Sequence, residues 1–216
     1  MSISEKTTTT RREEIVTACE KLYQTMSFRE ITLKEISEET SFSRPSIYNY
    51  FATKEEIFLA LFEREYDRWN AELEEIHRGK RKLSVRALAE KLAKSLAARP
   101  QLLKLLSMNL YDMEANSSLE SLTRFKHSYG RALENMKRIL LKFRPEMTGG
   151  QIRDFIYAFF PFMFGVYPYT EVTAKQKKAM EQADIDFEQT TAKELVFTFI
   201  FNYLRRGNPA ETIFTE

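Results

Sequence analysis

Apolar residues recur along most of this chain at intervals of three and four positions. In the first clear series, Ile15, Cys19, Leu22 and Met26 fall on one face of a helix. No long stretch alternates apolar and polar residues with the period of two that marks half-buried strands. We therefore expect an all-α protein. Short helices follow Thr32 and cover 44–50, and longer ones cover about 11–26, 53–77, 84–98, 101–114, 118–143, 149–167, 174–184 and 191–205.

The expected helix starts share one local motif, Ser or Thr followed three residues later by Glu or Gln. In this capping box the hydroxyl accepts a hydrogen bond from a free amide, and the Glu or Gln accepts one in return. Because each of the seven matches precedes helix-forming sequence, together they give a consistent map of helix starts. The pairs are Thr10–Glu13, Thr32–Glu35, Thr53–Glu56, Ser117–Glu120, Thr148–Gln151, Thr173–Gln176 and Thr191–Glu194.

Two short expected helices lie near the N-terminus, separated by the turn Ser41-Phe42-Ser43. This is the helix-turn-helix pattern, whose second helix fits the major groove of DNA. A small shared core would lock the two helices at a steep angle: Leu33, Ile36, Phe42, Ile47 and Phe51. With Ser43 as its N-cap, the second helix would expose Arg44, Pro45, Ser46, Asn49 and the tyrosine hydroxyls.

A polar and charged run, 77–82, follows the fourth expected helix. Its composition favours a solvated connector, and contact with DNA or lipid is the alternative. We therefore expect a helix-turn-helix domain over 1–53, a connecting helix and linker over 54–82, and a C-terminal helical domain over 83–216.

The overall charge of the chain does not by itself indicate DNA binding. Hydrophobic residues make up 43% and charged residues 30% of the chain, as in ordinary globular proteins. The net charge is +2, and residues 1–60 hold eight Lys and Arg against ten Glu. An argument for DNA binding therefore depends on where the cations lie.

Several features favour a cytoplasmic location. Cys19 is the one cysteine, so the chain has no internal disulfide, and we interpret this thiol as a packing residue rather than a reactive one. The most apolar stretch, 155–169, contains Pro161 and Pro168 and is too short to span a membrane. The polar, threonine-rich residues 1–12 do not resemble a secretory leader.

Catalytic motifs are not found in the sequence. The two histidines, His77 and His127, form no metal-binding pair, and neither Cys-x-x-Cys nor a glycine-rich phosphate loop occurs. We expect no enzyme activity, no catalytic residue, no metal site and no cofactor.

The segment from Ile31 to Ile57 resembles the signature of the TetR family of transcriptional regulators. The resemblance rests on Thr32, Ile36, Ser41-Phe42-Ser43, Ile47-Tyr48-Asn49-Tyr50-Phe51 and Lys54. The segment lies near the N-terminus and is followed by a longer helical domain, as in that family. The turn departs from the family pattern, because glycine is usual in place of Ser41 and valine in place of Phe42. Pro45 is also unusual, although proline is tolerated in the first turn of a helix.

The resemblance implies roles for individual residues. Those matching positions that usually contact the DNA backbone are Thr32, Tyr48, Tyr50 and Lys54. Those on the recognition helix and at its start are Ser43, Arg44, Pro45, Ser46 and Asn49. Arg44 is the best base reader, since a guanidinium pairs with guanine through two hydrogen bonds, and Asn49 suits adenine or a phosphate. The alternatives are packing roles for both tyrosines, a solvated Arg44, and an ion pair of Lys54 with Glu55 or Glu56.

A homodimer is expected because two C-terminal helices, about 149–167 and 191–205, are apolar on more than one face. The family resemblance implies the same interface, and ordinary core packing is the alternative. The residues concerned are Ile152, Phe155, Ile156, Phe159 and Phe160 in one helix, and Leu195, Val196, Phe199, Ile200 and Tyr203 in the other. A symmetric dimer would require a near-palindromic double-stranded operator.

The resemblance also implies a small-molecule effector that weakens DNA binding. Apolar and aromatic residues favour a bulky apolar or aromatic ligand: Met108, Tyr111, Phe125, Tyr129, Phe159, Phe162, Met163 and Tyr167. Polar groups that could orient it are Asn109, Asp112 and His127. The alternative is that these aromatic side chains pack against one another in the core and leave no ligand cavity. The signal would pass through the fourth helix, which is expected alone to join the two domains.

The resulting hypothesis is a ligand-responsive, homodimeric transcriptional repressor. The competing hypothesis is a helical ligand carrier or scaffold that binds no operator. Exposure of residues 44–50 discriminates the two, because only a regulator needs that surface free to enter a DNA groove.

Overall fold

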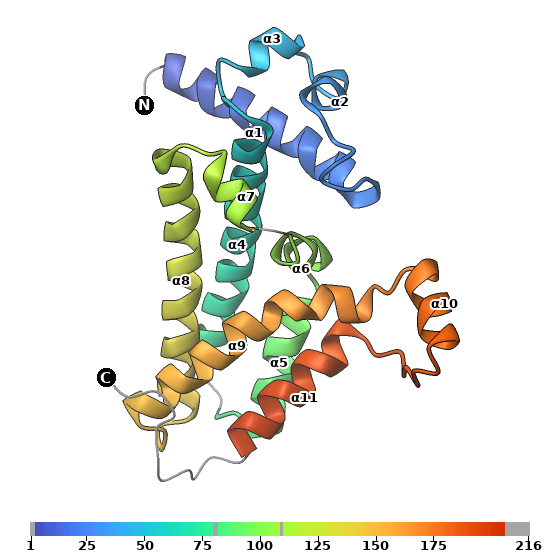
Figure 1. Ribbon diagram of the computed structural model, residues 1–216. Coiled ribbons are helices and arrows are strands. Elements are labelled where there is room, and N and C mark those ends of the chain that lie inside the picture. Colours follow the sequence, from blue (N-terminus) through green and yellow to red (C-terminus); the bar gives the residue numbers. More distant parts are fainter. Residues whose placement is uncertain (1–2, 80–81, 109, 206–216) are drawn as a thin grey trace. The chain divides into compact units, whose positions relative to one another are not determined.

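The computed structural model describes residues 3–79, 82–108 and 110–205, and every regular element among them is an α-helix (Figure 1). In chain order these are α1 (Ile3–Thr25), α2 (Leu33–Glu38), α3 (Arg44–Ile47), α4 (Lys54–Arg78), α5 (Val85–Ala97), α6 (Pro100–Leu106), α7 (Leu110–Ala115), α8 (Leu119–Phe143), α9 (Gly149–Thr170), α10 (Ala174–Gln182) and α11 (Ala192–Arg205). The all-α prediction is confirmed, and most helix bounds lie within a few residues of those expected.

Two helix predictions were wrong. The first helix begins at Ile3 rather than near Arg11, so it extends through the threonine-rich segment. The single helix expected over 101–114 is two helices, α6 and α7. The first ends where the amide of Ser107 donates to the carbonyl of Leu103. A continuous apolar pattern did not reveal this interruption.

Four capping boxes predicted from the sequence are confirmed. They start α2, α9, α10 and α11, and their residue pairs are Thr32–Glu35, Thr148–Gln151, Thr173–Gln176 and Thr191–Glu194. Thr10–Glu13 caps nothing, because it lies inside α1. The pair Thr53–Glu56 is half confirmed, because the hydroxyl of Thr53 accepts from the amide of Glu56 at 3.2 Å while the carboxylate of Glu56 accepts from the amide of Ala52. The remaining pair, Ser117–Glu120 at the start of α8, differs from the expectation.

The chain divides into two compact units. Among the described residues, the first unit contains 3–67 and 110–129, and the second contains 68–79, 82–108 and 130–205. The first unit thus combines the helix-turn-helix with α7 and the first half of α8, a segment expected in the C-terminal domain. The domain limits 1–53, 54–82 and 83–216 stay a prediction.

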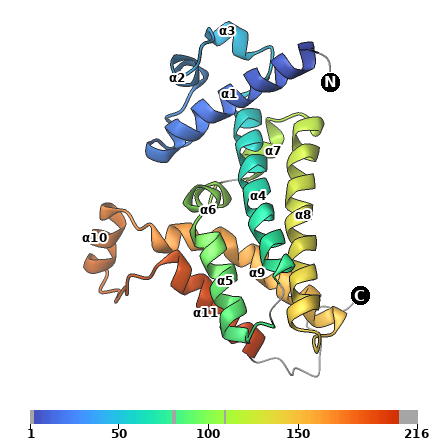
Figure 2. The same ribbon diagram turned by 180° about the vertical axis from the view of Figure 1, so that it is seen from behind.

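In the first unit, α2 and α3 lie on the same side of α1 (Figures 1 and 2). The core between them contains Ile15, Cys19, Ile31, Ile36, Ile47 and Phe51, all at most 1% exposed. Phe58 of α4 packs edge-on against Tyr23 and Phe28. Burial raises the pKa of the Cys19 thiol, as expected for a packing residue.

In the second unit, α5 and α11 lie side by side, and α6 and α11 both contact α9 (Figures 1 and 2). Their buried side chains include Leu88, Leu92, Leu96, Phe155, Phe159, Met163, Val196 and Ile200. The indole N–H of Trp69 donates to the hydroxyl of Ser95 at 3.1 Å, which satisfies the one polar group of this buried ring.

Neither a membrane-spanning helix nor a metal-binding cluster is present among the described residues. None of the helices in residues 3–79, 82–108 and 110–205 is long and apolar enough to cross a membrane. Within the same residues, no group of three or more His, Cys, Asp or Glu side chains could hold a metal ion.

Candidate nucleic-acid interface

The second helix of the helix-turn-helix, α3, has one face in the core and one in solvent. Ile47 and, just beyond the helix, Phe51 are buried. Arg44 and Asn49 are exposed, and Tyr48 is 50% exposed. The predicted recognition surface, 43–50, is therefore open to a DNA groove in this chain.

Local contacts at the start of α3 explain why the proline is accommodated. Ser43 occupies the predicted N-cap position, but its hydroxyl makes no capping hydrogen bond and instead lies 2.9 Å from that of Ser46, which is half-buried. Pro45 is exposed and falls in the first turn of the helix, where a missing N–H costs nothing.

The turn before α3 tolerates serine in place of glycine. Among the described non-glycine residues only Asp184 has a positive φ, so Ser41 carries no left-handed strain. Its amide donates to the carboxylate of Glu14 at 2.7 Å, and this hydrogen bond helps to lower the pKa of Glu14. Phe42 packs at a tilt against the ring of Tyr50, with 6.1 Å between ring centres.

Tyr50 is half-buried, and its hydroxyl accepts a hydrogen bond from a residue of α1. The guanidinium of exposed Arg11 donates to the Tyr50 hydroxyl at 3.4 Å, and this contact raises the pKa of Arg11. The same guanidinium lies 5.7 Å from the centre of the Phe42 ring. Sequence reasoning missed Arg11 as a cation beside the recognition surface, because only the fold brings α1 next to Tyr50.

Thr32 and Lys54, the other two residues predicted to contact the DNA backbone, both form hydrogen bonds within the chain. The exposed Thr32 caps α2, accepting a hydrogen bond from the amide of Lys34 at 3.2 Å. Lys54 donates to the carbonyl of Phe28 at 2.8 Å, and partial burial lowers the pKa of its amine. The charge of Glu55, named in the alternative interpretation, acts in the opposite direction to burial and raises this pKa.

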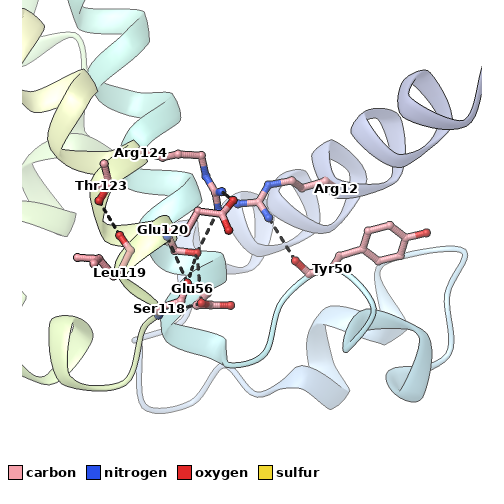
Figure 3. Close-up of polar contacts among 9 residues, drawn as sticks. Arg12, Tyr50, Glu56, Ser118, Leu119, Glu120, Thr123 and Arg124 are labelled. Atoms are coloured by element: carbon pink, nitrogen blue, oxygen red, sulfur yellow. Dashed lines mark hydrogen bonds and ion pairs between the residues drawn. The ribbon is translucent and has the colours of Figure 1, made fainter. Parts of the chain in front are cut away.

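A polar network lies at the start of α4, beside α1 and the start of α8 (Figure 3). Arg12 donates to the carbonyl of Tyr50 at 3.2 Å, and its guanidinium lies 4.1 Å from the centre of the Phe51 ring. Burial lowers the pKa of Arg12, and the nearby charge of Arg124 adds to this effect. Arg12 thereby joins α1 to the segment that leaves α3.

Glu56, which is 6% exposed, occupies the same network. Its carboxylate accepts hydrogen bonds from the amide of Ala52 at 2.9 Å, the amide of Ser118 at 3.0 Å and the hydroxyl of Ser121 at 3.2 Å. Burial alone would raise the pKa of Glu56, but these hydrogen bonds outweigh burial and lower it.

The start of α8 is therefore capped from a distant part of the chain. The predicted local pair Ser117–Glu120 is wrong, since Glu120 forms an ion pair with Arg124 at 2.6 Å. Ser118 takes the capping position and accepts from the amide of Ser121 at 3.2 Å. Glu56, 62 residues earlier in the chain, supplies the carboxylate that accepts a hydrogen bond from the amide of Ser118. A local motif search cannot find such a partner.

The predicted ligand-binding residues fall into both compact units. Those in the first are Tyr111, Asp112, Phe125, His127 and Tyr129, and those in the second are Met108, Phe159, Phe162, Met163 and Tyr167. Asn109 lies outside the described residues. Tyr111 is 83% exposed, and Asp112 and His127 are exposed.

Ring packing joins some of these residues within each unit. Phe125 contacts Phe62 and Tyr66 of α4, with 4.8 and 6.0 Å between ring centres, and Tyr129 packs edge-on against Tyr66. In the second unit Phe162 is stacked on Phe199.

Phe159 and Met163 are fully buried, whereas Met108, Tyr129 and Tyr167 are half-buried. A separate surface pocket beside α10 is lined by Met180, Ile185 and Phe187, among others, and by no predicted residue. A common ligand cavity stays a prediction.

Family models match both parts of the chain. Residues 15–61 match the model described as bacterial regulatory proteins, tetR family, and residues 63–199 match the tetracyclin repressor-like C-terminal domain. Comparison with curated proteins gave no match.

Solved structures with the same fold include three regulators named FadR, of which the Bacillus halodurans protein is described as a fatty acid degradation regulator. The Bacillus halodurans protein is 15% identical, with a TM-score of 0.58 over 90% of this chain and 94% of that one. The Thermus thermophilus repressor, solved with lauroyl-CoA, is 17% identical, with a TM-score of 0.58 over 95% and 100%. The Bacillus subtilis protein, solved with stearoyl-CoA, is 17% identical, with a TM-score of 0.55 over 88% and 96%. The two family models, together covering most of the chain, show that it belongs to the TetR family of transcriptional regulators.

Proposed function

We propose that this chain is a cytoplasmic repressor that binds a near-palindromic operator as a homodimer and is released by an apolar small molecule. The observation that carries the proposal is the exposed surface of residues 43–50 on a helix whose other face is buried. A carrier or scaffold has no need of such a surface, whereas a regulator requires it.

Arg44 is the proposed base reader. Its side chain is exposed at the first position of α3, so its guanidinium is free to pair with the O6 and N7 atoms of guanine. Asn49 and Tyr48, also exposed, are proposed to contact bases or phosphates beside it. Arg11, exposed next to Tyr50, adds a cation suited to a phosphate.

The proposed dimer interface uses α9 and α11, but fewer of their residues than the sequence suggested. Ile152, Phe155, Phe159, Phe160, Val196 and Ile200 are already buried in the single chain. Apolar side chains that stay partly exposed are better candidates for contact with a second copy: Ile156, Leu195, Phe199 and Tyr203. Tyr157, which is 63% exposed on α9, extends this apolar surface.

The proposed effector is a molecule with a long apolar part. Support comes from the aromatic residues of α9, including Phe162 and Tyr167, which are only half-buried in the free chain. Two of the solved relatives bind lauroyl-CoA and stearoyl-CoA. Long-chain acyl-CoA is therefore the first class to test.

For regulation, the effector must prefer a form of the protein that binds DNA poorly. The expectation that only the fourth helix joins the two parts was wrong. Both α4 and α8 contribute residues to the first and to the second compact unit. The proposed signal can therefore pass through α8 as well as through α4.

The direct test is a gel-shift assay with the DNA upstream of the chain's own gene. We expect a salt-sensitive shift that unlabelled random duplex competes away only at a large excess. Equal competition by specific and random duplex would contradict operator recognition and favour a carrier or scaffold.

A further inference from the structure

The carboxylate of Glu56 accepts hydrogen bonds from residues at the starts of two helices that are far apart in sequence. One oxygen accepts from Ala52, immediately before α4, and the other accepts from Ser118 and Ser121 at the start of α8. A second bond ties the same places together, because the hydroxyl of Thr53 donates to the carbonyl of Asn116 at 2.8 Å. All these residues belong to the first compact unit.

The segment just before α4 is also the end of the recognition region. Arg12 donates to the carbonyl of Tyr50 (Figure 3). Phe51 is buried, and Glu56 accepts a hydrogen bond from the amide of Ala52. The recognition helix itself has only four residues, which is too short for a stable isolated helix. Its orientation therefore depends on how the segment 50–52 is held.

We propose that Glu56 is a positioning residue through which the start of α8 sets the orientation of the recognition helix. The inference rests on the proposed function and adds a route for its regulation. From Gly130 onward, α8 belongs to the second compact unit, so a displacement of this helix along its axis reaches Ser118 directly.

A displacement of α8 that left Glu56 in place would break hydrogen bonds to a buried carboxylate. If the start of α8 withdrew, the buried carboxylate would lose two of its three donors, and the amide of Ser118 would lose its acceptor. Leaving buried charged and polar groups without partners is unfavourable, so Glu56 and the attached residue Ala52 would follow the helix.

The test compares three variants of the full chain. Ser121→Ala removes one donor to Glu56 from the α8 side, together with the contacts of the same hydroxyl with Ser118 and Arg124, and leaves the bond between Glu56 and Ala52 in place. Glu56→Gln removes the shared charge. Glu134→Gln is the matched control, because it makes the same chemical change on α8, at an exposed side chain that pairs with Lys137 away from this network.

Two readouts are used for each variant. The first is hydrogen exchange of the segment containing residues 50–52, measured without DNA. The second is affinity for the upstream duplex, at a temperature where all variants are folded. A merely structural role would lower the melting temperature without moving either readout.

We expect Ser121→Ala to speed exchange at residues 50–52 and to weaken DNA binding, each by about tenfold, because the bond to the buried carboxylate of Glu56 is lost along with the contacts to Ser118 and Arg124. Adding Glu56→Gln should then give less than the product of the separate effects, because both changes break one contact. The proposal is overturned if Ser121→Ala matches Glu134→Gln in both readouts. Failure of the unmodified chain to bind the duplex would refute the proposed function, while hydrogen exchange would still test the link. If Glu56→Gln does not fold, Ser121→Ala carries the test alone.

Discussion

The ammonium group of Lys54 donates a hydrogen bond of 2.8 Å to the carbonyl oxygen of Phe28 and lies 4.0 Å from the centre of the Phe28 ring. The contact joins the start of α4 to the turn that follows α1. A residue that the family resemblance assigns to DNA contact thus also stabilises the helix-turn-helix in the absence of DNA.

Lys54→Met should lower the free energy of unfolding by about 1–2 kcal/mol, because a charged hydrogen bond and a cation–π contact are lost together. Urea unfolding measures this change. Lys34→Met is the control, since Lys34 makes only an exposed i,i+4 pair with Glu38. Unchanged stability, together with a weaker salt dependence of DNA binding, would show that Lys54 acts on phosphate alone.

Arg44→Ala should weaken operator binding by about 1–3 kcal/mol and relax base preference at one position of each half-site. Its side chain is exposed, so the melting temperature should stay the same. Affinity for a set of single-base operator variants measures both effects. Arg78→Ala, at the exposed end of α4, serves as the control. Intact base preference in Arg44→Ala would contradict the assignment of α3 as the recognition helix.

Ile156→Asp should convert the proposed dimer to a monomer of 25.5 kDa, because a charge would enter an apolar interface between copies. Sedimentation at micromolar concentration distinguishes the two masses. Leu141→Asp places the same charge on an exposed apolar position of α8 and should leave the dimer intact. A monomeric unmodified chain would contradict the interface on α9 and α11.

Lauroyl-CoA should raise the melting temperature and release the bound duplex. A ligand at one hundred times its dissociation constant stabilises the folded state by about 2.7 kcal/mol. Coenzyme A without the acyl chain is the control, and we expect it to have little effect because it lacks the apolar part. Stabilisation without release of DNA would mean that the ligand does not distinguish the two states of the protein.

The stabilising contribution of Glu56 should depend on pH. Its pKa in the folded chain lies below the ordinary value of 4.5, so the folded state favours the charged form. The contribution is therefore fully present above that value and is lost as the pH falls through the lower, folded-state pKa. Unfolding of the unmodified chain and of Glu56→Gln should differ at pH 7 and converge in acid. A difference that does not change with pH would contradict this ionisation.

Much of the fold follows from local sequence. The period of three and four positions predicted the helices, and hydroxyl–carboxylate pairs such as Thr32–Glu35 located their starts, because these signals depend on residues within one turn of each other. The same local reasoning placed α2, the turn and α3, and it selected Arg44 and Tyr48 as exposed. The ligand residues and the dimer interface stay predictions.

The tertiary structure decided how these parts are held. Only the fold brings Glu56 to Ser118, Lys54 to Phe28 and Arg12 to Tyr50, and it groups residues 110–129 with the helix-turn-helix. The same local motif, Ser or Thr followed three residues later by Glu or Gln, was right for α2, α9, α10 and α11 and wrong for α8. The cause is physical: a helix start needs an acceptor for its free amides, and the fold supplied a buried carboxylate from a distant helix in place of the local one.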